Sequence, residues 1–411
     1  MTKNLNDTLK EKLDEIAEYN LSHSTNNTHL GGLVGNAGIA LFQSYYAQFT
    51  SNERYLESTE EILNHCFDQI NEGYSVLPYC TGLAGLGWTI NHLVKKEFIE
   101  EEYITIFSDL DETLYQAMCW EMEENDHHYD FLHGALGYGF YFLERMNDTQ
   151  DHSEKATYKT YLLHLIDLLK ISMIALKSGG GFWKSIIDLE TRAPVFMFGL
   201  SHGSASIISF LLRASQNEDL ATSAKPLLIQ AIDGIMGFCN HAGKYFFPLS
   251  LDTEEIDAMV IGKECRLAWC HGDLGIAMTL WQAAQILDRN DIQQLALKIF
   301  DGASKRRRGA ESGVMDVGLC HGSFGIAQLF GRIYKLSGLA RFKQLSEFWL
   351  SDGLQRGQFE DGIAGFKEWY APEKKFQNSN ELLVGTSGIG LAMMDYLNDY
   401  QLSWDNCMLL S

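Results

Sequence analysis

A short glycine phrase recurs along the whole chain and limits the folds that the chain can adopt. The phrase G-x-x-G, followed each time by an apolar stretch, begins at Gly35, Gly82, Gly134, Gly272, Gly322 and Gly385. A further copy begins at Gly203 and has Ser206 in place of its second glycine. Successive first glycines are 47, 52, 69, 69, 50 and 63 residues apart, so each step has room for two helices and their loops.

The segments between the phrases show helical patterns of two kinds. Segments that begin at a phrase are apolar nearly all round, as buried helices are: 39–49, 204–213, 276–287, 326–336 and 389–397. Segments that precede a phrase are amphipathic, which is typical of an outer layer: 56–70, 104–122, 161–176, 226–239, 292–304 and 342–354. The chain has only five prolines, which also favours helices.

These alternating helices predict an all-α fold, an α/α toroid of about seven helix pairs with the glycine turns gathered at one end. An open solenoid of helix pairs is the alternative, but near-constant spacing would be expected of a solenoid and this spacing is uneven. We expect a single domain over 1–411. The stretches 178–198 and 240–266 lack a helical period, so either could form an inserted irregular lobe with strands.

Charge and composition exclude several classes of function. The chain has 32 Lys and Arg against 54 Asp and Glu, a net charge of −22 that disfavours nucleic-acid binding. The basic run 305–308 is the exception, and we interpret it either as a solvated loop or as a docking site for an acidic leader peptide or partner protein. No apolar run is long enough to span a bilayer, and residues 5–16 predict a charged amphipathic helix rather than a signal peptide. We therefore expect a cytoplasmic protein whose eight cysteines are reduced.

Histidine and cysteine occupy the same place in several phrases. Histidine directly precedes the first glycine at His133, His202, His271 and His321. Two of these histidines follow a cysteine, in the pairs Cys270-His271 and Cys320-His321. A toroid would bring equivalent positions to one rim, and sulfur and imidazole ligands suit Zn²⁺. Three protein ligands with an open position would indicate catalytic zinc, whereas four would indicate a structural site.

These motifs resemble those of the lanthionine synthetase C-like family. The resemblance is carried by Gly199-Leu-Ser-His202-Gly, Arg266-Leu-Ala-Trp-Cys270-His-Gly, Cys320-His321-Gly and Gly385-Thr-Ser-Gly388, and it covers essentially the whole chain. It implies an α/α toroid with a catalytic zinc ion. It also implies addition of cysteine thiols to dehydroalanine or dehydrobutyrine in a dehydrated precursor peptide, which closes thioether rings. A dehydratase and an exporter at the inner face of a bacterial membrane are the implied partners.

The resemblance also assigns roles to individual residues. The implied zinc ligands are Cys270, Cys320 and His321, and the implied catalytic residues are His202, Asp130 and Arg266. In this scheme Arg266 stabilises the enolate oxygen, and His202, oriented by Asp130, transfers a proton. The chain departs from the family pattern at His271, because the cyclases often have tyrosine after the first zinc cysteine.

Other interpretations of the same residues stay open. A Cys-His-Gly phrase also occurs in non-cyclase relatives, so the chain could instead bind thiol peptides such as glutathione, or act as a scaffold for partners. Zinc-assisted prenyl transfer would need several Lys or Arg around a pyrophosphate, and Arg266 is the only basic residue at the motifs. Asp130 and Arg266 could also form a purely structural pair, and Cys265 could be a spare ligand.

Overall fold

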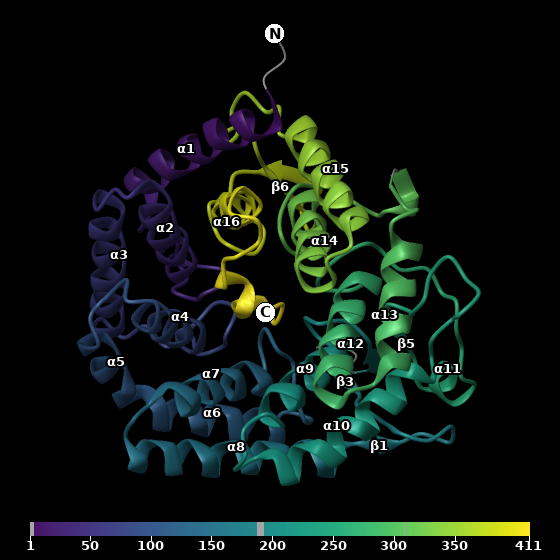
Figure 1. Ribbon diagram of the computed structural model, residues 1–411. Coiled ribbons are helices and arrows are strands. Elements are labelled where there is room, and N and C mark those ends of the chain that lie inside the picture. The colour runs from purple at the N-terminus through teal and green to yellow at the C-terminus, as the bar shows by residue number, and fades with distance from the viewer. Residues whose placement is uncertain (1–3, 187–192, 308) are drawn as a thin grey trace. The chain divides into compact units, whose positions relative to one another are not determined.

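The computed structural model describes residues 4–186, 193–307 and 309–411. The chain divides into two compact units, which are coloured along the chain in Figure 1. Unit 1 combines both ends of the chain, Met1–Phe107 and Val314–Ser411, and unit 2 is Ser108–Gly313. The expectation of one domain over 1–411 stays a prediction.

Unit 1 is built from helices of both chain ends. Its elements are α1 (Leu5–His23), α2 (Asn36–Thr50), α3 (Arg54–Asn71), α4 (Leu83–Lys95), α5 (Glu102–Phe107), α14 (Ser323–Ser337), α15 (Ala340–Arg356), β6 (Glu368–Tyr370), β7 (Lys375–Gln377), α16 (Thr386–Leu397) and the 3₁₀ helix η3 (Trp404–Met408). The buried helices α2 and α14 pack against the amphipathic helices α3 and α15. The last buried helix, α16, packs against α1, so the first helix of the chain covers the last one.

Unit 2 repeats this pairing and adds short strands. Its elements are η1 (Ser108–Leu110), α6 (Asp111–Glu123), α7 (Ala135–Asp148), α8 (His152–Ser172), β1 (Ile174–Ala175), β2 (Gly181–Phe182), β3 (Ser185–Ile186), β4 (Pro194–Met197), α9 (Ser204–Ala214), α10 (Ala221–Met236), β5 (Ser250–Leu251), α11 (Thr253–Asp257), α12 (Asp273–Leu287), α13 (Asn290–Ala303) and η2 (Gly309–Glu311). The buried helices α7, α9 and α12 pack against α8, α10 and α13 respectively.

Each phrase glycine is the N-cap of a buried helix, as predicted from the sequence. Local crowding explains why the position must be glycine. A Cβ atom on Gly272 would lie 2.2 Å from the carbonyl oxygen of Arg266, six residues earlier. A Cβ on Gly325, the second glycine of its phrase, would lie 1.9 Å from the oxygen of Leu319. The preceding loop therefore crosses directly against the start of the helix, and any side chain would separate the two.

The structure departs from the predicted helix over 104–122, which is broken into α5, η1 and α6. Ser108 and Asp109 lie at the break, and such side chains compete with helical backbone hydrogen bonds. Asp111, the first residue of α6, accepts hydrogen bonds from the hydroxyl groups of Tyr141 (2.6 Å) and Tyr158 (2.5 Å). These bonds fix the start of α6 against α7 and α8.

The two stretches without a helical period contain strands β2 to β5, whereas β1 lies at the end of the predicted helix 161–176, which stops at Ser172. Strands β1 and β2 pair antiparallel, and β3, β4 and β5 form a second antiparallel sheet in that order. In this sheet Ser185 is opposite Val195, and Phe196 is opposite Leu251. Residues 187–192 of the first stretch lie outside the described residues.

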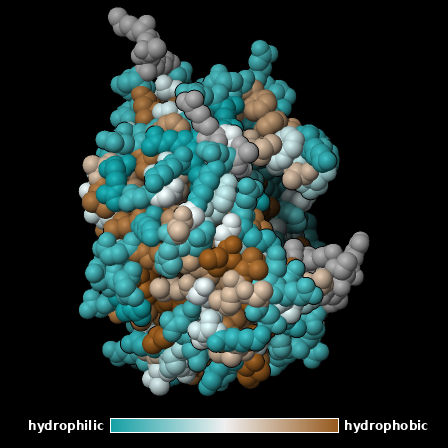
Figure 2. Space-filling view, turned by 90° about the vertical axis from the view of Figure 1, so that its right-hand side faces the viewer, coloured by the Kyte–Doolittle hydropathy of each residue, from teal (hydrophilic) through white to brown (hydrophobic). Residues whose placement is uncertain are grey.

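Hydrophilic side chains cover most of the face seen in Figure 2, with apolar residues in small groups between them. Over the described parts of the chain, no helix is both long and apolar enough to cross a bilayer. None of the eight cysteines, all of which are described, forms a disulfide.

Candidate active site

The residue six positions before each phrase glycine is held against the start of a buried helix. The Ala135 amide donates to the carbonyl oxygen of His128 at 3.0 Å, and the Ser323 amide donates to that of Asp316 at 3.2 Å. Arg266 forms an isolated parallel β-bridge with Gly272. The repeated turn therefore fixes polar residues beside helix N-termini, which carry partial positive charge.

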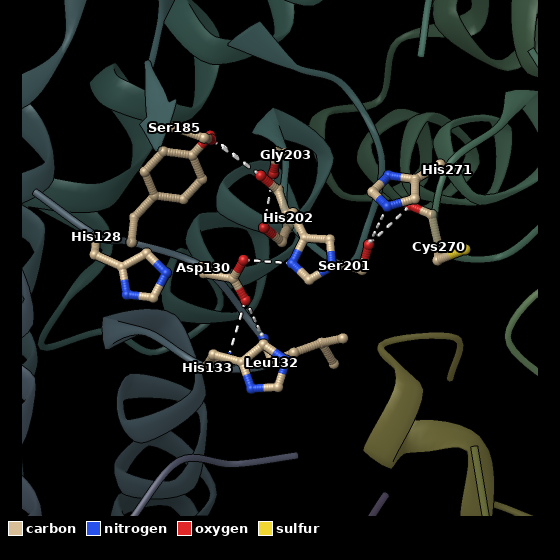
Figure 3. Close-up of polar contacts among 12 residues, drawn as sticks. His128, Asp130, Leu132, His133, Ser185, Ser201, His202, Gly203, Cys270 and His271 are labelled. Atoms are coloured by element: carbon tan, nitrogen blue, oxygen red, sulfur yellow. Dashed lines mark hydrogen bonds and ion pairs between the residues drawn. The ribbon is translucent and has the colours of Figure 1, made fainter. Parts of the chain in front are cut away.

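Asp130 and His202 form a tightly coupled pair in unit 2 (Figure 3). Nδ1 of His202 donates to Oδ2 of Asp130. The other carboxylate oxygen, Oδ1, accepts from the backbone amides of Leu132 (2.8 Å) and His133 (2.9 Å). Asp130 is buried, so these bonds replace the water that an ionised carboxylate needs. The arrangement fixes the ring of His202 and leaves Nε2 as its proton-exchanging atom.

The two groups shift each other's pKa in opposite directions. Burial of Asp130 opposes ionisation, but the positive charge of His202 and their hydrogen bond outweigh it and lower the pKa of Asp130 to about 2. Burial of His202 opposes protonation, yet the charge and hydrogen bond of Asp130 raise the pKa of the imidazole above its ordinary value. Asp130 is therefore the anionic partner that supports an imidazolium at position 202.

Two further histidine rings, those of His133 and His271, lie beside that of His202. The ring centroids of His133 and His202 are 6.0 Å apart and those of His202 and His271 are 5.1 Å apart. Burial lowers the pKa of both His133 and His271. Two neutral imidazoles therefore flank the one whose protonated form Asp130 favours.

Ser201 ties the His202 phrase to the Cys270 phrase. Its amide and its hydroxyl both donate to the carbonyl oxygen of Cys270, at 3.3 Å each. The same hydroxyl lies 3.4 Å from Nε2 of His271, as Figure 3 shows. The two phrases approach closely because Gly199 has no side chain: a Cβ there would lie 2.0 Å from the Cys270 oxygen. The backbones at Cys270 and His202 are thus held at a fixed distance from each other within unit 2.

A second pair of hydroxyl groups holds the backbone of His202. Tyr129 and Ser185 are hydrogen-bonded to each other at 2.6 Å. Both hydroxyl oxygens also lie within hydrogen-bond distance of the carbonyl oxygen of His202, at 3.4 Å for Tyr129 and 3.2 Å for Ser185, so one of the two donates to it. Together with Asp130 they fix both the main chain and the ring of this histidine.

Arg266 is half-buried in unit 2, and its positive charge contributes to the lowered pKa of His271. Asp130 pairs with His202 rather than with Arg266, so the interpretation of a structural Asp130–Arg266 pair is not supported. Cys265 lies against another cation: its sulfur is 3.6 Å from Nη1 of Arg306. Burial raises the pKa of this thiol to about 12, which disfavours it as a spare ligand.

Residue 308 of the basic run 305–308 lies outside the described residues, and the other three residues are only in part a solvated loop. Arg306 is 1% exposed and its guanidinium is paired with the buried carboxylate of Asp273, in the first turn of α12. The same carboxylate accepts from the amides of Phe246 (3.2 Å) and Phe247 (3.0 Å). Arg306 is therefore unavailable for docking a peptide, while Lys305 and Arg307 are exposed.

Cys320 and His321 lie in unit 1, at the turn that opens α14. The Cys320 amide donates to the carbonyl oxygen of Leu383 at 2.9 Å. Nε2 of His321 lies 3.6 Å from Oδ2 of Asp316, and the Trp369 amide donates to the same oxygen at 3.1 Å. Asp316 is buried, so its carboxyl group is held in a fixed position beside the histidine. Cys270 belongs to unit 2, and the complete three-ligand set stays a prediction.

Sequence reasoning missed several residues of these arrangements. Asp316 had a usable signal, since it stands six residues before Gly322 as Arg266 does before Gly272. Ser201 lies within the motif Gly199-Leu-Ser-His202-Gly, whereas Tyr129 and Ser185 had no signal, because their contacts depend on segments distant in the chain.

Comparisons with known proteins identify the family and the fold of the chain. Residues 30–409 match the family described as lanthionine synthetase C-like protein. Among solved structures, the chain is similar to nisin cyclase with a TM-score of 0.71 and 17% sequence identity, over 98% of this chain and 97% of that chain. This likeness shows the fold and confirms the predicted all-α toroid class.

Proposed function

This chain belongs to the lanthionine synthetase C-like family, and we propose that it is a zinc-dependent cyclase that adds cysteine thiols of a dehydrated peptide to dehydroalanine or dehydrobutyrine. The observation that carries the proposal is the Asp130–His202 pair, whose phrase is bonded through Ser201 to the backbone of Cys270. An acid–base group thus adjoins a thiol suited to bind a metal. The precursor peptide is the proposed substrate, and a dehydratase and an exporter are proposed partners.

The proposed ligands fit zinc by their chemistry. Cys270, Cys320 and His321 each offer one ligand atom, two sulfurs and one imidazole nitrogen. Zinc in proteins is bound by such atoms, and three protein ligands leave a position for substrate. Asp316 beside His321 supports the set, because a carboxylate commonly orients a zinc-binding histidine through its other nitrogen.

His202, Asp130 and Arg266 then each have a defined role in the reaction. Zinc bound to these ligands would keep a peptide thiol deprotonated at neutral pH, where a free thiol of pKa about 8.5 is mostly protonated. His202 exchanges a proton at Nε2, because Nδ1 is engaged by Asp130. Asp130 stabilises the imidazolium when His202 holds that proton. Arg266 supplies positive charge for the enolate oxygen that forms when sulfur attacks the β-carbon.

A mass-spectrometric count of free thiols on a dehydrated precursor peptide tests the proposal. Zinc-loaded protein is expected to consume thiols, and His202→Ala is expected to retain zinc and lose cyclisation. The matched control is His152→Ala, an exposed histidine at the start of α8. Wild-type protein that holds zinc but leaves every thiol free would contradict the cyclase and favour a non-catalytic thiol-peptide binder.

A further inference from the structure

A cavity of about 260 Å³ lies within unit 1, and neither Asp130 nor His202 is among its lining residues. It is lined by the end of α1 and the loop after it, by the β6–β7 hairpin and by the loop before α16, and it is open to solvent on one side. Water occupies about 30 Å³ per molecule in the liquid, so this volume suits a side chain or a chain end rather than a single metal ion. It is smaller than the roughly 300–1,000 Å³ of pockets for drug-sized ligands.

The lining is polar and acidic. Glu368 and Glu381 contribute carboxylates, and Asn27, Gln377 and Asn380 contribute amides. Among the described residues that line the cavity, none is lysine or arginine. The imidazole of His23 is engaged locally, since Nδ1 lies 2.9 Å from the carbonyl oxygen of Tyr19. The cavity therefore offers two carboxyl groups and no lysine or arginine to neutralise them.

The two carboxylates are held in place by uncharged partners. Gln377 Nε2 donates to Oε1 of Glu368, and the Ser379 hydroxyl donates to Oε2 of Glu381 at 3.5 Å. Burial raises the pKa of both carboxyl groups, and the charge of Glu368 contributes to raising that of Glu381 to about 7. A cation between them would remove this repulsion.

The cavity is connected through strand β6 to Asp316, the carboxyl group beside the proposed zinc ligand His321. Strand β6 presents Glu368 to the cavity, and the amide of the next residue, Trp369, donates to Asp316. Asp316 in turn faces Nε2 of His321 at 3.6 Å. A group bound at Glu368 would thus lie near His321, a proposed zinc ligand.

We propose that this cavity binds an ammonium or guanidinium group of the peptide substrate, through Glu368 and Glu381, while a nearby cysteine of that peptide reacts. The inference rests on the proposed peptide-cyclase function. The cation is either a lysine or arginine side chain or the free amino terminus of the peptide. Charge-assisted hydrogen bonds to two carboxylates would then select substrates by the position of a positive charge.

Ligand-observed NMR titrations of the full, zinc-loaded chain test the cavity without any cyclisation. The probes are Nα-acetyl-lysine methylamide, its uncharged norleucine analogue, and alanine methylamide with a free amino group. We expect at least one charged probe to bind and the norleucine probe to fail. Binding by the lysine probe alone assigns the site to side chains, and binding by the alanine probe alone assigns it to the amino terminus.

The double variant Glu368→Gln, Glu381→Gln should raise the Kd of the bound probe by about tenfold or more. The matched control is Glu373→Gln, an exposed carboxylate between β6 and β7 that does not line the cavity. Equal binding of lysine and norleucine probes by wild-type protein overturns the proposal, and this comparison needs no variant to fold. Calcium binding with no ammonium binding overturns it too.

A separate assay distinguishes this proposal from the cyclase proposal. If the wild-type protein binds the charged probes but leaves all thiols of a dehydrated peptide free, the cyclase function fails and the cavity remains a cation site. If it cyclises the peptide but ignores the probes, the cavity proposal fails. In a working cyclase, a peptide with lysine near the reacting cysteine should have a lower KM than its norleucine counterpart, and the double variant should remove that difference.

Discussion

The carboxylate of Asp130 joins two backbone amides to the ring of His202: Oδ1 accepts from Leu132 and His133, while Oδ2 accepts from Nδ1 of the histidine. The ring orientation therefore depends on the turn that opens α7, more than seventy residues earlier in the chain. This relationship makes Asp130 a positioning residue, whose effect on catalysis is exerted through His202.

Asp130→Asn is expected to reduce kcat for cyclisation by about tenfold to a hundredfold, less than the ~10²–10⁴ expected when His202 itself is removed. Loss of the anion should also lower the pKa of His202, because Asp130 is what raises it. If His202 acts as a base, the acidic limb of the kcat–pH profile therefore moves to lower pH. Zinc content should not change. An unchanged rate and profile would exclude the positioning role.

Arg266→Ala is expected to lower kcat by roughly 10²–10³ while zinc and peptide binding persist, because its charge acts only when the enolate oxygen forms. Steady-state kinetics with a dehydrated peptide measure this, and metal analysis confirms that the site is intact. Arg307→Ala, which removes an exposed cation of the run 305–308, serves as the control. A higher KM with normal kcat would instead assign Arg266 to substrate binding.

Arg306→Met is expected to destabilise the protein by about 3–5 kcal/mol, because Asp273 would be left as a buried, unpaired carboxylate. Urea denaturation followed by circular dichroism measures the loss. Arg307→Met on the exposed side of the same run should change the stability by less than about 0.5 kcal/mol. Equal effects of the two substitutions would contradict the assignment of Arg306 to the core.

The fold was largely predictable from the sequence because one local requirement recurs. Each phrase glycine caps a buried helix, and the crowding at Gly272 shows why the repeat tolerates no side chain there. The break at Ser108 was not predictable, since it depends on Asp111 meeting two tyrosines from other helices. Local pattern therefore predicts helix starts better than it predicts interruptions within a helix.

For the candidate site, the sequence predicted the residue types but not their partners. Asp130 and His202 could be singled out by their places in the phrases, and the structure brings them into contact. The contacts of Tyr129 and Ser185 with the carbonyl oxygen of His202 could not be predicted, because Ser185 lies in a short strand without a helical or motif signal. The burial of Arg306 in the basic run 305–308 could not be predicted either, since its partner Asp273 is 33 residues away in the chain.

Glu381→Gln is expected to stabilise the protein above neutral pH. The carboxyl group ionises near pH 4.3 in an unfolded chain and near 7 in the folded protein, where burial and Glu368 oppose its charge. Between these values the unfolded state has lost a proton that the folded state retains, so the wild type loses stability as the pH rises, and the loss is complete above pH 7. At pH 8 the variant should be more stable by roughly 1–3 kcal/mol, allowing for the partial solvent access of the side chain.

Urea denaturation at pH 4 and pH 8 separates this effect from a change in packing, because the advantage of the variant should vanish at pH 4. Glu373→Gln provides the exposed control and should show no such pH dependence. A variant that is less stable than wild type at pH 8 would mean that the ionised Glu381 has a favourable partner in the folded protein. If the expected gain is found, Glu381 is a residue that costs stability in the absence of ligand, which is consistent with a carboxylate retained for binding a cation.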